Sequence, residues 1–257
     1  MTFGNVGSMN TSHALLPVSR GFGLMAVTLG LMALAGVAGC QSGRGGAVGS
    51  VLTSDARATM TPAAVVADLK AGNQRFVKGQ STNFDHLAQV QKTAHGQFPK
   101  AVVLSCLDSR VPPELVFDQG IGDIFVGRVA GNFENEDMLG SMEFATAVAG
   151  AKAIVVLGHS HCGAVKGAAD DAKLGNLTAT LANIRPAVDA TRAKFPQGSH
   201  NSKDEAFVQA VAIENVRMTV RDITGRSPVL AERVAKGELV VIGGMYDLDT
   251  GAIEWLD

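Results

Sequence analysis

Residues 101–106 read AVVLSC and residues 153–163 read AIVVLGHSHCG, and these two stretches decide the predicted fold. Each begins with a short, uninterrupted apolar run, which is typical of a strand buried on both faces of a parallel sheet. Each run is followed directly by residues that can bind metals or act in catalysis, Cys106 after the first and His159 and Cys162 after the second. If the two strands are neighbours in a parallel sheet, these residues meet at its carboxyl edge.

Helices and strands alternate around these two runs. Further strands are predicted at residues 123–126, 239–243 and 252–256, the last two forming a hairpin. The sequence therefore predicts an α/β fold, with a central, mostly parallel sheet flanked by helices and an antiparallel edge hairpin. Apolar spacing and capping signals predict helices over residues 62–79, 84–95, 135–150, 203–224 and 227–237.

The composition describes a globular domain with an appended leader. The chain has 257 residues, 46% hydrophobic and 18% charged, which excludes disorder, collagen and coiled coil as descriptions of the whole. Residues 1–50 contain two arginines and no acid, so residues 51–257 carry 20 Lys+Arg against 24 Asp+Glu. This mildly acidic balance offers no basic footprint for nucleic acid.

Residues 1–39 have the layout of a secretory signal peptide with a lipobox. Arg20 precedes an uncharged run from Gly21 to Gly39, and the small residues Val37-Ala38-Gly39 stand directly before Cys40. This tetrapeptide resembles the lipobox of bacterial lipoproteins, in which the cysteine is lipidated and the chain is cut before it. The alternatives are ordinary signal cleavage and an uncleaved anchor, although five glycines make the run a poor membrane span.

All three interpretations of the leader place the domain outside the cytoplasm. We expect a periplasmic protein of the cell envelope, anchored to the membrane through a lipid on Cys40. Residues 40–60 are predicted to form a flexible tether, and residues 61–257 the folded domain. With Cys40 lipidated, the mature chain keeps two thiols.

Three side chains that bind transition metals follow the two buried strands. Cys106 comes after the first run, and His159 and Cys162 follow the second in His-x-x-Cys spacing. Two thiolates and an imidazole are good zinc ligands, and three protein ligands leave the open position of a catalytic site. A redox thiol pair is the alternative, but neither cysteine stands in a Cys-x-x-Cys context. We therefore predict one Zn²⁺ per chain.

A candidate catalytic pair follows the first of these cysteines. Asp108 and Arg110 stand two and four residues after Cys106, where they can form a bidentate ion pair close to the open position. A carboxylate so placed can accept the proton of a zinc-bound hydroxide, for which zinc lowers the pKa of water. We predict Asp108 and Arg110 as catalytic residues.

These motifs resemble the signature of a known family, the β-class carbonic anhydrases. The resemblance covers about residues 62–257. It implies a zinc enzyme for the reversible hydration of carbon dioxide to bicarbonate and a proton, through a zinc-bound hydroxide. It is carried by Cys106-x-Asp-Ser-Arg110 and Gly158-His-Ser-x-Cys-Gly163, with Arg128-Val-Ala-Gly-Asn132, Glu143-Phe-Ala145 and Tyr246-Asp247 in support.

The resemblance also implies residues that bind the substrate. Gln97 matches a glutamine that hydrogen-bonds substrate, and the Gly163 N–H matches a donor to bicarbonate. Phe125 and Ala130 match residues that line the carbon dioxide pocket from the facing subunit, and Phe144 stands where some members have tyrosine. Members are dimers or assemblies of dimers, so we expect a homodimer or a higher homo-oligomer.

Three points of the resemblance bear on regulation and proton transfer. Val103 replaces the tryptophan of members with an inhibitory bicarbonate site, so we expect no such regulation. In some members the residue matching Asp108 ligates zinc at low pH in a closed state, and the sequence leaves this open. The candidate proton shuttles are His86, His95 and His161.

Other functions fit some of the same residues. Hydrolysis of carbonyl sulfide or carbon disulfide would use the same metal and scaffold. A non-catalytic zinc-containing envelope protein would have no use for an Asp108–Arg110 pair. A general zinc hydrolase is disfavoured because no glutamate adjoins a metal histidine, as it does in His-Glu-x-x-His.

Overall fold

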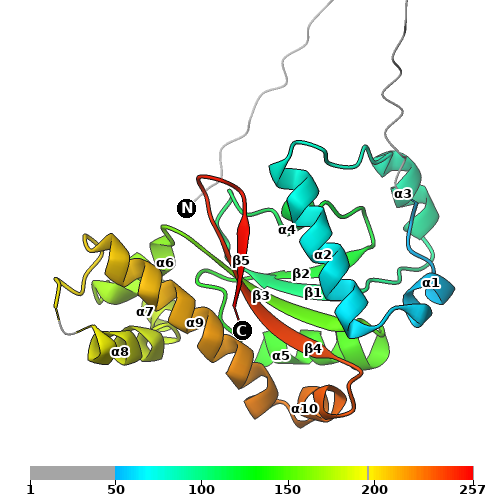
Figure 1. The fold of residues 1–257 in the computed structure, drawn as a ribbon. Coiled ribbons are helices and arrows are strands. Elements are labelled where there is room, and N and C mark those ends of the chain that lie inside the picture. The colour runs from blue at the N-terminus through cyan, green and yellow to red at the C-terminus, as the bar shows by residue number, and fades with distance from the viewer. Residues whose placement is uncertain (1–49, 196, 257) are drawn as a thin grey trace, which may run out of the picture. The chain divides into compact units, whose positions relative to one another are not determined.

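The computed structural model describes residues 50–195 and 197–256, and the following statements concern these residues. Their five strands form one sheet in the order β2-β1-β3-β4-β5 (Figure 1). The first four strands run parallel, and β5 is antiparallel to β4, so the predicted fold is confirmed. The strands are β1 (Ala101–Ser105), β2 (Ile124–Arg128), β3 (Ala153–His159), β4 (Val240–Tyr246) and β5 (Ile253–Leu256).

Ten α-helices and one π-helical segment, η1, accompany these strands in the described residues. None of these helices has the length and hydropathy that a membrane span requires. The helices are α1 (Ser54–Thr59), α2 (Pro62–Val77), α3 (His86–Thr93), α4 (Pro113–Val116), α5 (Glu136–Glu143), η1 (Phe144–Val148), α6 (Gly163–Ala169), α7 (Gly175–Ala182), α8 (Arg185–Lys194), α9 (Glu205–Arg226) and α10 (Pro228–Ala235).

Both faces of the sheet are covered, which explains its continuous apolar runs. In β3, Val155 and Leu157 belong to a core shared with α2 and α4. Ile154 and Val156 point to the other face, into a core shared with α5, α6, α8 and α9 (Figure 1). Because alternate side chains of a strand point to opposite faces, a strand buried on both faces has no solvent-facing positions and is apolar over most of its length.

Two glycines allow α9 to pack closely against the sheet. A Cβ atom on Gly158 would lie 2.6 Å from Val216 Cγ2, and a Cβ atom on Gly243 would lie 2.6 Å from Val216 Cγ1. Both distances are shorter than a van der Waals contact. Glycine at the end of β3 and in β4 therefore sets the distance between α9 and the strand that carries His159.

The structure corrects several predicted boundaries. The helix predicted over 84–95 is limited to α3, which begins after its N-cap Asp85. The helix predicted over 135–150 consists of α5 and the π-helical η1. The prediction missed α4, α6, α7 and α8. None of these four has a side-chain N-cap hydrogen bond, and α4 has four residues, so the usual start signals are weak.

Helix α1 corrects the end of the predicted tether. Thr53 caps this helix by accepting the Ala56 N–H. Arg57 donates a hydrogen bond to the Ala149 carbonyl oxygen and lies 5.7 Å from the centre of the Phe98 ring. Residues from Ser54 onward are therefore attached to the domain. The predicted signal peptide, Cys40 and the first part of the tether lie outside the described residues.

Candidate metal centre

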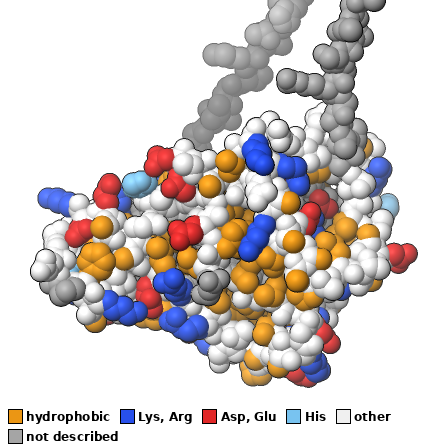
Figure 2. Space-filling view, in the orientation of Figure 1, with side chains coloured by type: hydrophobic (Ala, Val, Ile, Leu, Met, Phe, Trp, Pro, Cys, Tyr) orange, Lys and Arg blue, Asp and Glu red, His pale blue; other side chains and the backbone are white. Residues whose placement is uncertain are grey.

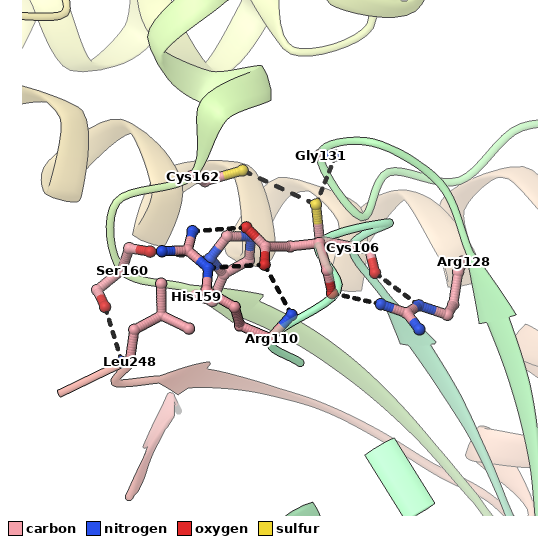
Figure 3. A network of polar contacts seen from close by, with 9 residues as sticks. Cys106, Arg110, Arg128, Gly131, His159, Ser160, Cys162 and Leu248 are labelled. Carbon is pink, nitrogen blue, oxygen red and sulfur yellow. Dashed lines mark hydrogen bonds and ion pairs between the residues drawn. The ribbon is translucent and has the colours of Figure 1, made fainter. Parts of the chain in front are cut away.

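The predicted metal ligands meet at the carboxyl ends of β1 and β3, which are adjacent parallel strands. Cys106 follows β1, His159 ends β3 and Cys162 precedes α6. The strands are paired with Ser105 opposite Leu157, so Cys106 and His159 leave the sheet at neighbouring points. The three ligand atoms all lie within 4.8 Å of one another, and all three residues are buried (Figure 3).

His159 presents one ring nitrogen that has no protein partner. Its Nδ1 lies 2.8 Å from the Ser160 carbonyl oxygen, which can only accept, so Nδ1 carries the proton. Nε2 is then a bare lone pair, and it has no hydrogen-bond partner although His159 is fully buried. Buried polar atoms normally have a hydrogen-bond partner. In a metal-binding histidine, one ring nitrogen binds the metal and the other typically donates a hydrogen bond, as Nδ1 does here. This orphaned nitrogen beside two thiols fits a zinc ion.

The two thiols hold unequal affinities for their protons. Their sulfur atoms lie 4.0 Å apart, and the Gly131 N–H donates to Cys106 Sγ at 3.3 Å. The pKa of Cys106 lies below its ordinary value, chiefly because the Cys162 thiol donates to it. The same contact, together with burial, raises the pKa of Cys162. Both sulfur atoms can therefore be ionised together only when a cation is bound between them.

Asp108 and Arg110 form the predicted pair. Arg110 donates from Nε to Asp108 Oδ1 at 2.9 Å and from Nη2 to Oδ2 at 2.7 Å. These bonds hold the pKa of the Asp108 carboxyl well below its usual range. Asp108 Oδ2 also lies 3.8 Å from His159 Nε2. The carboxylate thus stays ionised next to the three ligands without being one of the close group.

Arg128 holds the loop that carries both Cys106 and Asp108. Its Nε donates to the Cys106 carbonyl oxygen at 2.9 Å, and its Nη2 donates to the Asp108 carbonyl oxygen (Figure 3). Arg128 belongs to the motif Arg128–Asn132, and its sequence position alone indicates no role for it. Its acceptors lie 22 and 20 residues away, so no local pattern reveals the contact.

The loop after β2 supports Cys106 from a second direction. Gly131 donates to the sulfur with φ at +90°, and a Cβ there would lie 2.3 Å from Ile184 Cδ1. Asn215 of α9 is buried and donates from Nδ2 to the Gly131 carbonyl oxygen at 2.8 Å. Gly131 is therefore fixed by conformation and by packing, and Asn215 is a further supporting residue that the sequence did not indicate.

Two of the predicted substrate residues adjoin residues of the candidate metal centre. Gly163 follows Cys162 at the start of α6, and a Cβ there would meet open space. Ala130 adjoins Gly131 in the loop against Cys106. Their proposed contacts with substrate stay predictions.

The other three predicted substrate residues lie away from the metal ligands of the same chain. Gln97 is exposed and precedes β1, so the whole of that strand lies between it and Cys106 in the sequence. Phe125 pairs with Val102 in the first half of β1, and its ring centre lies 6.4 Å from that of Phe144. Both rings line a groove of about 840 Å³ along β2 and α5 whose lining includes none of the three ligands.

The proton-shuttle candidates are also separated. His161 lies in the ligand loop, with Nδ1 3.9 Å from Glu205 Oε1 and Nε2 4.0 Å from Asp249 Oδ2. His86 begins α3 and His95 follows that helix, before β1. Of the three, His161 is therefore the one on the loop that also carries His159.

Comparison with known proteins gives matches over most of the domain. A family model described as carbonic anhydrase matches residues 101–253. Carbonic anhydrase 2 of Mycobacterium tuberculosis is 39% identical over 196 residues, covering 74% of this chain and 90% of that protein. The carbonic anhydrase of Mycolicibacterium smegmatis is 35% identical over 194 residues, covering 75% of this chain and 92% of that protein.

Solved structures agree with these sequence matches. The β-carbonic anhydrase CafA of Aspergillus fumigatus is 27% identical with a TM-score of 0.60, covering 76% of this chain and 90% of that one. A tetrameric β-carbonic anhydrase of Sordaria macrospora is 25% identical with a TM-score of 0.61, covering 76% and 94%. The chain therefore belongs to the β-class carbonic anhydrase family, whose general activity is the hydration of carbon dioxide.

Proposed function

We propose that this chain catalyses the reversible hydration of carbon dioxide to bicarbonate and a proton, using one Zn²⁺ held by Cys106, His159 and Cys162. The observation that carries the proposal is the ionised Asp108–Arg110 pair beside the orphaned His159 Nε2. Bound zinc would supply Lewis acidity that makes water a nucleophile near neutral pH. Relatives named carbonic anhydrase at 35–39% identity support the same activity here.

The chain's own residues orient the reactants. The Asp108 carboxylate accepts a hydrogen bond from the attacking water and so fixes the direction of the lone pair on the water oxygen. Arg110 keeps that carboxylate ionised and, by gripping both oxygens, fixes its plane. The Gly163 N–H donates to negative charge as it develops on the substrate oxygens. Arg128 holds the backbone on which Cys106 and Asp108 are mounted.

We further propose that a second copy completes the substrate pocket. Strand β2 is an edge of the sheet, and its groove exposes Phe144 by 55% in the single chain. Exposed aromatic surface around an edge strand is typical of a subunit interface. The tetrameric relative of Sordaria macrospora supports a homodimer or a higher assembly. Gln97, Phe125 and Phe144 would then act on the partner's metal centre.

The catalytic proposal is tested by variants of the ion pair. Asp108→Asn should lower carbon dioxide hydration, measured by stopped flow, by about 10²–10⁴-fold while zinc stays bound. The matched control is Asp189→Asn, which breaks an exposed Asp–Arg pair (3.1 Å to Arg192) on α8 and should leave the rate unchanged. If Asp108→Asn hydrates carbon dioxide as fast as the wild type, the non-catalytic alternative is favoured.

The substrate assignment is tested by comparing three substrates on the same sample. Carbon dioxide should be turned over faster than carbonyl sulfide or carbon disulfide. Faster hydrolysis of either sulfur compound would replace the proposal with the alternative reaction.

We also propose that the chain is a periplasmic lipoprotein attached through Cys40. The order of Arg20, the apolar run and the Val37–Cys40 tetrapeptide supports this assignment. The intact mass of the protein extracted from membranes should show loss of residues 1–39 and an added lipid, and Cys40→Ser should abolish both. An unlipidated mature chain or an uncleaved leader would contradict it.

A further inference from the structure

The edge of the sheet opposite β2 carries a second groove that the metal centre does not use. Strand β4 pairs with β3 along its whole length but with β5 only over Gly243–Tyr246. Within the described residues, Val240–Ile242 therefore have no strand partner on that side. The Val240 N–H donates to the carbonyl oxygen of Lys152, which directly precedes β3, so the backbone groups of Val240 face β3. The N–H and C=O groups of successive strand residues point to opposite sides. The N–H and C=O of Val241 consequently face the open side.

The groove lies along this open segment, between α2 and α9, and has a volume of about 420 Å³. This volume falls within the range of known binding pockets, about 300–1,000 Å³. Figure 2 shows hydrophobic side chains gathered in the middle of this face, with Lys and Arg side chains beside them. The half-buried apolar side chains of the lining are those of Val66, Val220, Val241, Ile242, Trp255 and Leu256.

The rim of the groove is positively charged. Lys70 Nζ lies 5.0 Å from the centre of the Trp255 ring. Arg217 is exposed and makes no ion pair with a described residue, and Arg221 lies 3.6 Å from Glu214. Glu214 also lies 3.3 Å from Lys194, so one carboxylate serves two cations and the rim keeps a net positive charge.

The positive charge of the rim limits which chain segments could bind in the groove. Residues 1–50 contain no acidic residue, so the chain's own N-terminal segment does not complement the rim. A second copy related by a two-fold axis would place the basic rim against itself. An acidic partner complements it, and an open strand edge selects an extended backbone.

We propose that this groove binds an extended peptide segment of a partner protein that carries both apolar and acidic side chains. The segment adds as a strand along Val240–Ile242 and exchanges hydrogen bonds with the Val241 backbone. Its apolar side chains contact Trp255 and its neighbours, and its carboxylates lie near Lys70, Arg217 and Arg221. The groove shares no residue with the metal centre, so this proposal is independent of the catalytic one.

Trp255 makes the binding test direct, because it is the one tryptophan of the chain. Its fluorescence is titrated with a library of acetylated hexapeptide amides built from Val, Leu and Glu, and with a matched library built from Val, Leu and Lys. We expect saturable binding by glutamate peptides, weakened by salt, and none by lysine peptides. No saturable change with any glutamate peptide, or equal binding by lysine peptides, would overturn the proposal.

Charge reversal identifies the site. The combined variant Lys70→Glu, Arg217→Glu, Arg221→Glu should weaken glutamate-peptide binding at least tenfold. Lys78→Glu, which changes an exposed lysine at the end of α2 outside the groove, should not. Both variants should keep wild-type carbon dioxide hydration, which verifies the fold. Equal binding by the combined variant and the wild type would place the site elsewhere.

Backbone methylation tests the strand pairing without altering the protein. The amide nitrogens of the best-binding peptide are methylated one at a time. Methylation of a nitrogen that donates to β4 should abolish peptide binding, and methylation of a nitrogen that points away from β4 should leave the affinity unchanged. Equal affinity for every methylated peptide would overturn the strand assignment. If the groove binds sodium dodecanoate but no peptide, the strand assignment is also overturned, because the groove is then a site for a small amphipathic anion.

Discussion

The two ends of strand β1 present parts of the site in different ways. At the carboxyl end, Cys106 and His159 are buried, and Gly131 and Ser160 of the same chain hold them in place. At the amino end, Gln97 is exposed, and the whole of β1 lies between it and Cys106 in the sequence. The three candidate metal ligands therefore come from one chain, whereas the substrate pocket that we propose needs a second one.

The largest effect is expected from removing a metal ligand at the carboxyl end. Cys162→Ser should abolish zinc binding and reduce hydration to the uncatalysed rate, because the set within 4.8 Å loses a thiolate. Metal content and stopped-flow rates are measured on one sample. Cys40→Ser is the matched control and should keep both. A Cys162→Ser enzyme with one zinc and full activity would show that this cluster is not the metal centre.

The amino end is tested by mixing two inactive variants. Asp108→Asn and Gln97→Ala should each be strongly impaired, but unfolding and refolding them together should restore up to a quarter of wild-type activity. This follows because half of the random pairs are hybrids, and each hybrid has one site with intact Asp108 and a partner's intact Gln97. The measurement is hydration rate against mixing ratio. No recovery in confirmed hybrid dimers would place Gln97 in its own chain's site or outside catalysis.

A smaller effect is expected from Arg128, which holds the loop at the carboxyl end of β1. Arg128→Lys keeps the charge but cannot donate to both the Cys106 and Asp108 carbonyl oxygens. Weaker positioning should lower kcat by about tenfold, equivalent to about 1.4 kcal/mol. Zinc should stay bound, and Arg192→Lys on α8 should have no effect. Loss of zinc with no change in the rate per bound zinc would show that Arg128 supports metal binding alone.

The smallest perturbation is a change of pH. Two thiolates donate more charge to zinc than imidazoles do, so its water should be less acidic than the value of about 7 found with three histidines. The hydration rate should therefore rise between about pH 6 and pH 9. Asp108 does not add to this slope, because Arg110 holds its pKa below the ordinary 3.8. A flat profile would contradict the charge argument.

The depressed pKa of Asp108 has its own consequence for stability. A carboxyl with a lowered folded-state pKa stabilises the fold above its unfolded pKa, and this contribution is lost as the pH falls further. The free energy of unfolding of Asp108→Asn and the wild type should therefore converge below about pH 3.8. The Asp108–Arg110 ion pair is partly exposed, so above that pH the two proteins should differ little in free energy of unfolding.

Much of this molecule could be predicted from its sequence because the decisive signals are local. Continuous apolar runs gave β1 and β3, and the residues directly after them gave Cys106, His159 and Cys162. Asp108 and Arg110 were predictable for the same reason, since both stand on the loop that begins at Cys106.

The contacts that could not be predicted join residues far apart in the sequence. Arg128 reaches back 22 residues to Cys106, and Asn215 reaches back 84 residues to Gly131. Such contacts depend on the packing of β2 and α9 and leave no periodic pattern. The groove beside Val240–Ile242 has the same origin, because among the described residues β5 pairs with β4 only over Gly243–Tyr246.

The central claim is that one chain holds a catalytic zinc centre for carbon dioxide hydration. The most direct test measures the stopped-flow hydration rate and the metal content of the same purified sample. We predict one zinc per chain and a hydration rate that falls when zinc is removed by a chelator and returns when zinc is restored. One zinc per chain with no hydration of carbon dioxide would contradict the claim.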